Sequence, residues 1–200
     1  MARRTVRIIG GKWKGRKIEV VQRPSLRPTM DRVRETVFNW LGTEIEGARV
    51  LDLFAGTGAL AFEALSRGAA SATLVEHDQR TASALRAQAV RLHAACEIHN
   101  VPALPWLRRQ ATWSWDIVFV DPPFERPQRI RGAHAARGRS LAAEVLALLR
   151  QYDTIVYLES RSGTDIPGWT TIKQSRAGDC RFRLLRPSLC YDDAPDTPNA

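Results

Sequence analysis

The chain has 200 residues, 44% of them apolar, and a net charge of +9, which suits one globular domain with a sizeable core. No apolar run approaches the roughly 18–20 residues of a membrane span, and no apolar segment follows the basic N-terminus, so neither a membrane protein nor a secretory signal is expected. The three cysteines show no C-x-x-C spacing and no partnering histidine cluster; we expect reduced thiols, no metal site and a cytoplasmic protein.

The positive charge is concentrated near the N-terminus. Residues 1–34 contain eleven Lys and Arg but only two acidic residues, whereas the rest of the chain is balanced. Such a segment is typical of proteins that bind polyanions, above all nucleic acids, although a solvated tail would share its composition. The runs 6–9 and 17–21 favour strands around a glycine-rich turn, which predicts a hairpin with Lys12, Trp13 and Lys14 at its tip. The RNA contacts that we expect from this segment are Arg7, Lys12, Trp13, Lys14, Arg16, Lys17, Arg27 and Arg32.

Beyond a proline-punctuated linker, helical and strand patterns alternate along the chain. The predicted helices cover 29–41, 56–65, 79–94, 102–109 and 140–150; the predicted strands cover 48–54, 72–76, 96–100, 115–121 and 154–160. Two further strands surround a glycine turn within 169–187. This alternation predicts a parallel sheet covered by helices on both faces, with ligands at the carboxyl ends of its strands.

One segment does not fit the alternation. Residues 125–140 contain five arginines, one acid and no apolar periodicity. We interpret them as an irregular loop or a distorted helix start. They could form a second RNA-facing surface or a simple insertion, and the sequence does not decide between the two.

The stretch LDLFAGTGAL places small residues where a strand turns into a helix. Gly56 and Gly58 permit backbone torsions closed to other residues and allow a ligand close to the chain. With Ala61 they match G-x-G-x-x-A, and Glu76 lies twenty residues past Gly56, where a carboxylate can accept the hydroxyls of a ribose. This pattern suits NAD and S-adenosyl-L-methionine equally.

Asp52 favours the second of these cofactors. A buried carboxylate under the loop is unfavourable beside a pyrophosphate, but favourable beside the ammonium and sulfonium of S-adenosylmethionine. The DPPF stretch, moreover, has no role in hydride transfer. We place Phe54, Ala55 and His77, which neighbour these residues, in the same cofactor site.

The stretch DPPF, Asp121 to Phe124, ends an apolar strand abruptly because proline cannot donate to a sheet. Two acceptors that grip the two N–H groups of an exocyclic base amine would turn its nitrogen lone pair toward a methyl donor. The side chain of Asp121 and the carbonyl of Pro122 can do this, while Pro123 stiffens the turn and Phe124 offers a face on which the base stacks. Asp121 could also take up the amino proton, which the sequence does not establish.

The chain resembles the RsmD family, bacterial methyltransferases that modify N2 of a guanine in 16S ribosomal RNA of the small subunit. The blocks that carry the resemblance are RIIGGKWKGRKI, LRPTMDRVRETVFNWL, LDLFAGTGALAFEALSRGA, TLVEHD and VFVDPPF. The resemblance implies a Rossmann-like class I methyltransferase fold, seven-stranded and mostly parallel with an antiparallel last strand. It also implies S-adenosylmethionine as cofactor and an adenine contact at Ala103.

We therefore expect three regions: a basic hairpin and linker for RNA (1–28), a methyltransferase domain (29–190) and a disordered tail (191–200). The expected partner is 16S ribosomal RNA within the small ribosomal subunit, and the expected state is a monomer. Two other functions stay open: methylation of another amino group, such as adenine N6 in DNA or RNA, and an RNA-binding assembly factor without catalysis. A nicotinamide oxidoreductase is a distant third, because no acid or base for hydride transfer is evident.

Overall fold

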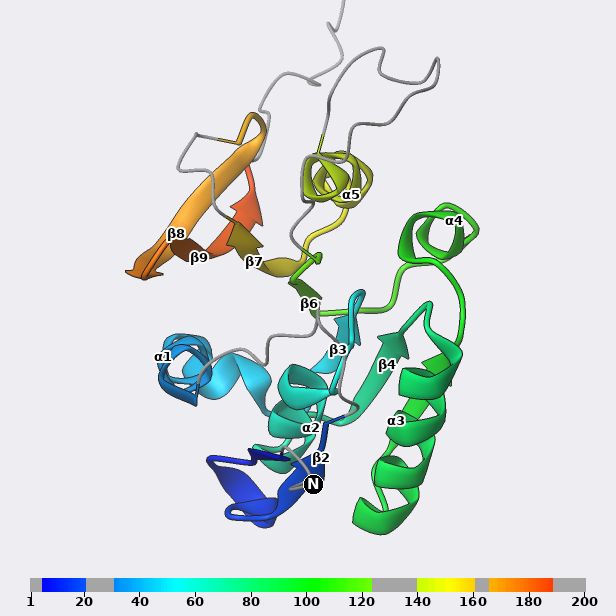
Figure 1. The fold of residues 1–200 in the computed structure, drawn as a ribbon. Coiled ribbons are helices and arrows are strands. Elements are labelled where there is room, and N and C mark those ends of the chain that lie inside the picture. The colour runs from blue at the N-terminus through cyan, green and yellow to red at the C-terminus, as the bar shows by residue number, and fades with distance from the viewer. Residues whose placement is uncertain (1–4, 21–30, 124–139, 161–165, 189–200) are drawn as a thin grey trace, which may run out of the picture.

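The computed structural model describes residues 5–20, 31–123, 140–160 and 166–188 of the chain. A seven-stranded sheet carries helices on both faces, and a two-stranded hairpin stands outside it (Figure 1). Arg27, Phe124, the linker, residues 125–139 of the arginine-rich segment and the tail lie outside the described residues, so the predictions made for them stay predictions.

The sheet has the strand order β5-β4-β3-β6-β7-β9-β8. The strands from β5 to β7 are parallel to their neighbours, whereas β9 is antiparallel to both β7 and β8. This confirms the predicted seven-stranded, mostly parallel sheet. The strands are β3 (Arg49–Asp52), β4 (Ser71–Val75), β5 (Cys96–His99), β6 (Ile117–Val120), β7 (Ile155–Ser160), β8 (Trp169–Ala177) and β9 (Cys180–Pro187).

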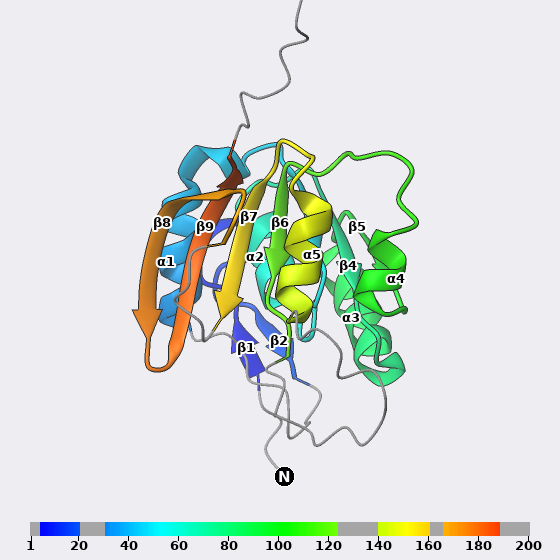
Figure 2. The ribbon, with the colours of Figure 1, turned by 90° about the horizontal axis from the view of Figure 1, so that it is seen from above.

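Five α-helices cover the sheet among the described residues: α1 (Asp31–Leu41), α2 (Ala59–Ser66), α3 (Gln79–Leu92), α4 (Ala103–Leu107) and α5 (Leu141–Leu149). Figure 2 shows α4 and α5 on one side and α1 and α2 on the other. Strand β6 supplies both cores because its side chains alternate: Ile117 and Phe119 pack toward α1–α3, and Val118 and Val120 toward α4 and α5. In the described ranges, no helix has the length and apolar character needed to cross a membrane.

Helix boundaries follow local chemistry. The side chain of Asp78 accepts a hydrogen bond from the Thr81 N–H at 2.9 Å and so caps α3. Ser140 caps α5 in the same way through the N–H of Ala143, at 3.3 Å. A short 3₁₀ helix (η2, Gly42–Ile45) follows α1. The sequence predicted the α-helices, with differences of a few residues at their ends.

The N-terminal hairpin consists of β1 (Thr5–Arg7) and β2 (Lys17–Glu19), paired antiparallel with Val6 opposite Ile18. The 3₁₀ helix η1 (Gly11–Trp13) lies in the connection between them. The hairpin lies against α2 and α3, close to the carboxyl edge of the parallel strands (Figures 1 and 2). The predicted hairpin is therefore present, with shorter strands than its apolar runs suggested.

Candidate active site

The glycine loop joins the end of β3 to the start of α2. Gly56 and Gly58 have φ values of +50° and +74°, in the left-handed region that favours glycine. A Cβ on Gly58 would lie 2.5 Å from the side chain of Phe62 and 2.7 Å from that of Leu85. Glycine is required at this position both by torsion and by the close packing of α2 and α3 behind the loop.

Glu76 fixes the loop from the end of the next strand. Its carboxylate is buried and accepts hydrogen bonds from the N–H of Gly56 at 3.0 Å and of Asp78 at 2.7 Å. Each carboxylate oxygen has a second lone pair for a ligand hydroxyl. The Asn100 side chain donates to the carbonyls of Glu76 and His77 at 2.9 and 3.0 Å, a support that no sequence pattern indicated. The geometry suits a carboxylate that receives a ribose.

Asp52 ends β3 beneath the same loop and is 2% exposed. Burial raises the pKa of its carboxyl group from 3.8 to about 7, and the charge of Glu76 adds to this, against hydrogen bonds from the backbone of Phe54 and Ala61. A buried carboxylate is unfavourable without a compensating charge. The site is thus built to gain from a cationic ligand, which fits the ammonium and sulfonium of S-adenosylmethionine.

The remaining predicted cofactor residues lie around this loop. Ala55 is buried, and its N–H donates to the carbonyl of Val75 at 3.0 Å. Phe54 and Ala103 belong to the core on the α4–α5 side, with Ala103 as the first residue of α4. The exposed His77 has its Nδ1 3.2 Å from a Glu76 oxygen. An adenine contact at Ala103 stays a prediction that the resemblance supplies.

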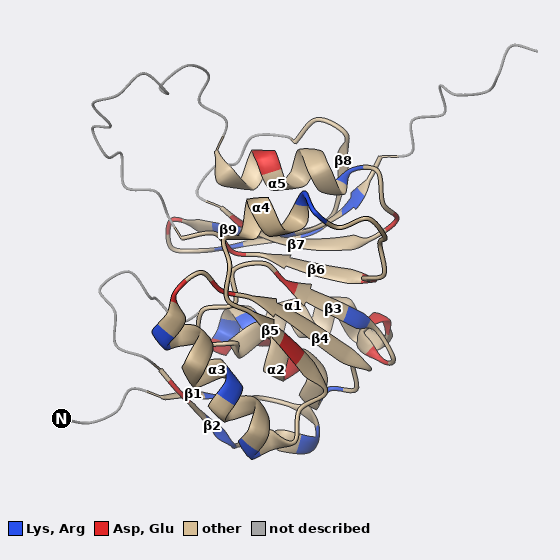
Figure 3. Ribbon diagram, turned by 90° about the vertical axis from the view of Figure 1, so that its right-hand side faces the viewer, with Lys and Arg blue, Asp and Glu red and all other residues tan. Residues whose placement is uncertain are grey.

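Asp121, Pro122 and Pro123 follow β6, the strand beside β3. Register pairs Asp52 with Phe119, so Asp121 lies two residues farther along the same edge. Asp121 and Pro122 are half-buried, and Pro123 is exposed. Parallel pairing of β4, β3 and β6 brings their carboxyl ends to one edge of the sheet, which therefore carries the glycine loop, both cofactor carboxylates and the DPP turn. Figure 3 shows these three strands side by side.

Strand β7 adds polar groups that the sequence did not single out. Tyr157 is fully buried, and its hydroxyl donates to Oε2 of Glu159 at 3.1 Å. The thiol of Cys180 donates to Oε1 of Glu159 at 3.0 Å. Burial raises the pKa of Tyr157, and the charges of Glu159 and Asp121 raise it further. The signal that could have found Glu159 is its place near the carboxyl end of the strand after DPPF.

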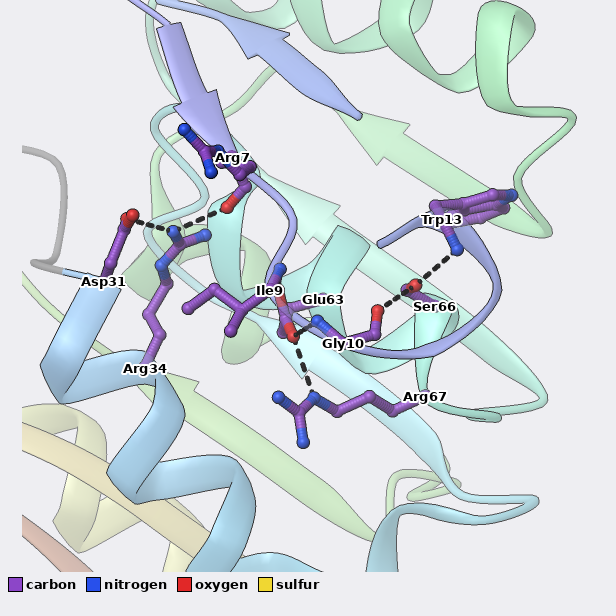
Figure 4. Close-up of polar contacts among 9 residues, drawn as sticks. All are labelled: Arg7, Ile9, Gly10, Trp13, Asp31, Arg34, Glu63, Ser66 and Arg67. Atoms are coloured by element: carbon purple, nitrogen blue, oxygen red, sulfur yellow. Dashed lines mark hydrogen bonds and ion pairs between the residues drawn. The ribbon is translucent and has the colours of Figure 1, made fainter. Parts of the chain in front are cut away.

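The basic hairpin is anchored by a buried acid of α2 (Figure 4). The Glu63 side chain is fully buried and accepts the N–H groups of Ile9 and Gly10 at 2.7 and 2.8 Å, and Nε of Arg67 at 2.8 Å. Ser66 donates to the Gly10 carbonyl at 2.6 Å. The hairpin's backbone therefore makes these polar contacts, which leaves its basic side chains free of this role.

Most predicted RNA-contacting side chains in the described residues are exposed. Trp13 differs: its side chain is buried, and its backbone N–H donates to Ser66 Oγ at 2.9 Å. The ring packs into the core, with Lys12 Nζ 4.6 Å from its centroid. Trp13 does lie in the connection between the two strands, as predicted, but its ring has an anchoring role, because its burial stabilises the hairpin on α2. An RNA contact at Trp13 stays a prediction. The exposed residues of the predicted set are Arg7, Lys12, Lys14, Arg16, Lys17 and Arg32.

No group of His, Cys, Asp and Glu side chains in the described part of the chain is arranged to hold a metal ion. The sheet order, the glycine loop after β3 and the acid after β4 together define a class I methyltransferase fold, the class that uses S-adenosylmethionine.

The model of the Conserved hypothetical protein 95 family matches residues 6–186, and the chain belongs to this family. The chain is 40% identical over 191 residues to Ribosomal RNA small subunit methyltransferase D of Escherichia coli K12, covering 90% of this chain and 89% of that protein. It is 35% identical over 197 residues to the protein of the same name from Haemophilus influenzae, covering 92% and 95%. These relatives confirm the resemblance to the RsmD family.

A solved structure supports the same assignment. The putative methyltransferase yhhF from Escherichia coli superimposes with a TM-score of 0.77 at 37% sequence identity, covering 92% of this chain and 98% of that one. Because the likeness spans nearly the full length of both chains, it extends well beyond the glycine loop that many methyltransferases share.

Proposed function

We propose that this protein transfers a methyl group from S-adenosyl-L-methionine to the exocyclic N2 amino group of a guanine in 16S ribosomal RNA of the small ribosomal subunit. The observation that carries the proposal is the position of Asp121 and Pro122, at the end of the strand beside Asp52 and the glycine loop. The two relatives described above act, by name, on small-subunit ribosomal RNA.

The cofactor site fits the residues present. Asp52 would face the cationic methionine end, the glycine loop would allow close approach of the chain, and Glu76 would accept the ribose hydroxyls. When bound, S-adenosylmethionine supplies a sulfonium-bound methyl group, which moves to the guanine nitrogen as the sulfur–carbon bond breaks. The chain's own task is to hold cofactor and base in line, which supplies much of the rate through proximity.

Asp121 and Pro122 hold the base in line with the methyl group. The carboxylate of Asp121 accepts one amino N–H, and the Pro122 carbonyl accepts the other, so that the nitrogen lone pair turns out of conjugation toward the methyl donor. Pro122 and Pro123 have no N–H to compete for the ligand, and their rings fix the turn. The proton that the amino nitrogen loses passes to Asp121 or to water. Phe124 is proposed to stack on the unstacked base.

The hairpin is proposed to hold the RNA backbone through its exposed cations, and the protein is proposed to act as a cytoplasmic monomer. The contacts of Glu63 and Ser66 support this role of the cations, because both side chains bind the main chain of the hairpin and leave its basic side chains available for RNA. The domain boundaries proposed for RNA binding, methyl transfer and the tail are 1–28, 29–190 and 191–200. Arg27 is included among the proposed RNA contacts.

The test is methyl transfer from labelled S-adenosylmethionine to small-subunit particles that lack the modification, with naked RNA and DNA as parallel substrates. The product is digested to nucleosides. N2-methylguanine from the wild type, and a loss of at least about 100-fold for Asp121→Ala, would support the proposal. N6-methyladenine would replace it with adenine methylation. RNA binding without label on any substrate would favour a binding factor.

A further inference from the structure

The carboxyl end of β7 lies beside the DPP turn. Parallel register pairs Val120 with Leu158, so that Asp121 and Glu159 follow at neighbouring positions on adjacent strands. Phe119 and Tyr157, two residues before them, lie in the same core on the α1 side, with ring centroids 6.2 Å apart. Because strand side chains alternate, Glu159 points to the face of Tyr157.

The charge of Asp121 also acts on the side chains around Glu159. After burial and Glu159, the charge of Asp121 contributes to the raised pKa of Tyr157, and it does the same for Cys180. Tyr157 and Cys180 are the two donors that contact Glu159. Two carboxylates, one following β6 and one near the end of β7, therefore lie on the same face at the carboxyl edge of the sheet.

Glu159 is held in place by two hydrogen-bond donors. Its two oxygens each accept one hydrogen bond, from the Tyr157 hydroxyl at 3.1 Å and the Cys180 thiol at 3.0 Å. No Lys or Arg among the described residues forms an ion pair with it. The residue is half-buried. Each oxygen keeps a lone pair for a further donor, so that a fixed acceptor lies next to the amine-binding turn.

We propose that Glu159 selects guanine, by accepting the N1–H of the base whose amino group Asp121 and Pro122 hold. The inference rests on the proposed function and deepens it. In guanine a ring N–H donor adjoins the amino group. In adenine and cytosine the ring nitrogen beside the amino group carries a lone pair, which a carboxylate repels. Asp121 alone grips an amino group of any base, whereas Asp121 with Glu159 fits the two adjacent donors of guanine.

The test uses wild type, Glu159→Ala, Glu159→Gln and a matched control, Glu44→Ala, whose exposed carboxylate pairs with Arg186 and lies in η2, before the amino end of β3. Methylation of unmodified small-subunit particles gives kcat/KM. Guanosine and 2-aminopurine riboside, which share the 2-amino group but differ at N1–H, are compared as inhibitors. Binding of S-adenosylmethionine and the thermal midpoint report on the cofactor site and on folding.

We expect Glu159→Ala to lose roughly 10–150-fold in kcat/KM, the size of one hydrogen bond to a charged group, with cofactor binding unchanged. The preference for guanosine over 2-aminopurine riboside should fall by a similar factor. Glu159→Gln keeps the size of the side chain and can donate as well as accept, so its preference should fall even if the alanine variant does not fold.

Wild-type kcat/KM together with wild-type guanosine preference in the Glu159 variants would overturn the inference while leaving the proposed function intact. A loss of activity with the base preference intact would also overturn it, since that result assigns Glu159 a packing role. Absence of N2-methylguanine from the wild type itself would instead remove the proposed function, and the inference with it.

Discussion

Glu63 and Gly10, separated by 53 positions in the chain, are joined by a 2.8 Å hydrogen bond from the Gly10 N–H to the buried carboxylate. The same carboxylate accepts the N–H of Ile9 and Nε of Arg67. The segment that follows β1 is thereby fixed to helix α2. Without this acid, two backbone donors and a guanidinium would lose their partner.

Glu63→Ala should therefore detach the hairpin. Removal of a buried carboxylate that accepts three hydrogen bonds is expected to lower the free energy of unfolding by roughly 3–5 kcal/mol. Urea denaturation measures the global effect, and hydrogen exchange at Ile9 and Gly10 measures the local one. Glu44→Ala, which removes an exposed ion-pair partner of Arg186, should cost less than about 1 kcal/mol. Equal losses in both variants would contradict the role of Glu63.

Asp52 should make the protein less stable as pH rises. The folded state keeps the carboxyl proton up to a pKa of about 7, whereas the unfolded state loses it near 3.8. The folded state thus binds more protons in this window, and the free energy of unfolding falls with pH across it, by about 4 kcal/mol at most. Asp52→Asn should remove this fall and be the more stable protein above about pH 7. Urea denaturation at a series of pH values measures this dependence. If the free energy of unfolding changes with pH identically in the wild type and the variant, Asp52 is not the group that causes the fall.

Cofactor binding should have the opposite pH dependence. S-adenosylmethionine carries positive charge toward Asp52, so binding requires the ionised carboxylate and releases its proton. Between about pH 8 and pH 6 the affinity should fall roughly tenfold for a pKa near 7. Calorimetry in buffers of different ionisation enthalpy measures both the affinity and the proton released. The Asp52→Asn variant should bind weakly at every pH, and a steep pH dependence in that variant would point to another group.

Gly58→Ala should disturb the glycine loop by two effects. The positive φ costs about 1–2 kcal/mol for any residue with a Cβ, and here that Cβ also meets Phe62 and Leu85. Gly42→Ala is the matched control: its φ is +52°, with no atom within 4 Å of the added Cβ. We expect a clearly larger loss of thermal stability and of cofactor affinity at Gly58. Equal effects at both glycines would mean that packing behind the loop is not tight.

The exposed hairpin cations should determine how RNA affinity depends on salt. Neutralising Lys12, Lys14, Arg16 and Lys17 together should weaken binding and reduce the salt slope by about one for each phosphate that the hairpin no longer neutralises. Neutralising four exposed cations elsewhere controls for net charge: Arg108, Arg109, Arg150 and Lys173. A slope that is unchanged in the hairpin variant, or reduced equally in the control, would place the RNA footprint outside the hairpin.

The candidate site residues whose positions in the fold the sequence predicted share a local signal. Gly56 and Gly58 mark a strand-to-helix turn, and the alternation of strands and helices determines which strand ends meet. Asp52, Glu76 and Asp121 fall at those ends because each follows an apolar run. Parallel strands place such ends on one edge whatever the details of packing, so these residues could be placed together without coordinates.

The residues that were missed or misplaced depend on contacts between distant segments. The sequence placed Trp13 at the tip of the hairpin among basic residues, but it did not reveal that the ring packs into the core beside α2. Arg34 belongs to the basic segment by sequence, but it is fully buried and donates to the carbonyl of Arg7 at 2.7 Å. Glu159 lies near the end of an apolar strand, close to where Asp121 lies on its own strand, but no prolines mark its importance. Local patterns do not reveal which partner lies across a helix or a sheet.

The attachment of the hairpin to α2 also fixes the hairpin relative to the cofactor site. Glu63 and Ser66 bind the segment that follows β1, and Val6 and Val20 pack on Ala59, the first residue of α2. The hairpin therefore lies along α2, the helix that starts at the glycine loop. The phosphates that the hairpin would bind and the base in the proposed site would thus be held at one fixed separation. An RNA would have to match this separation by its own folding, so the shape around the target guanine would become part of what the protein recognises.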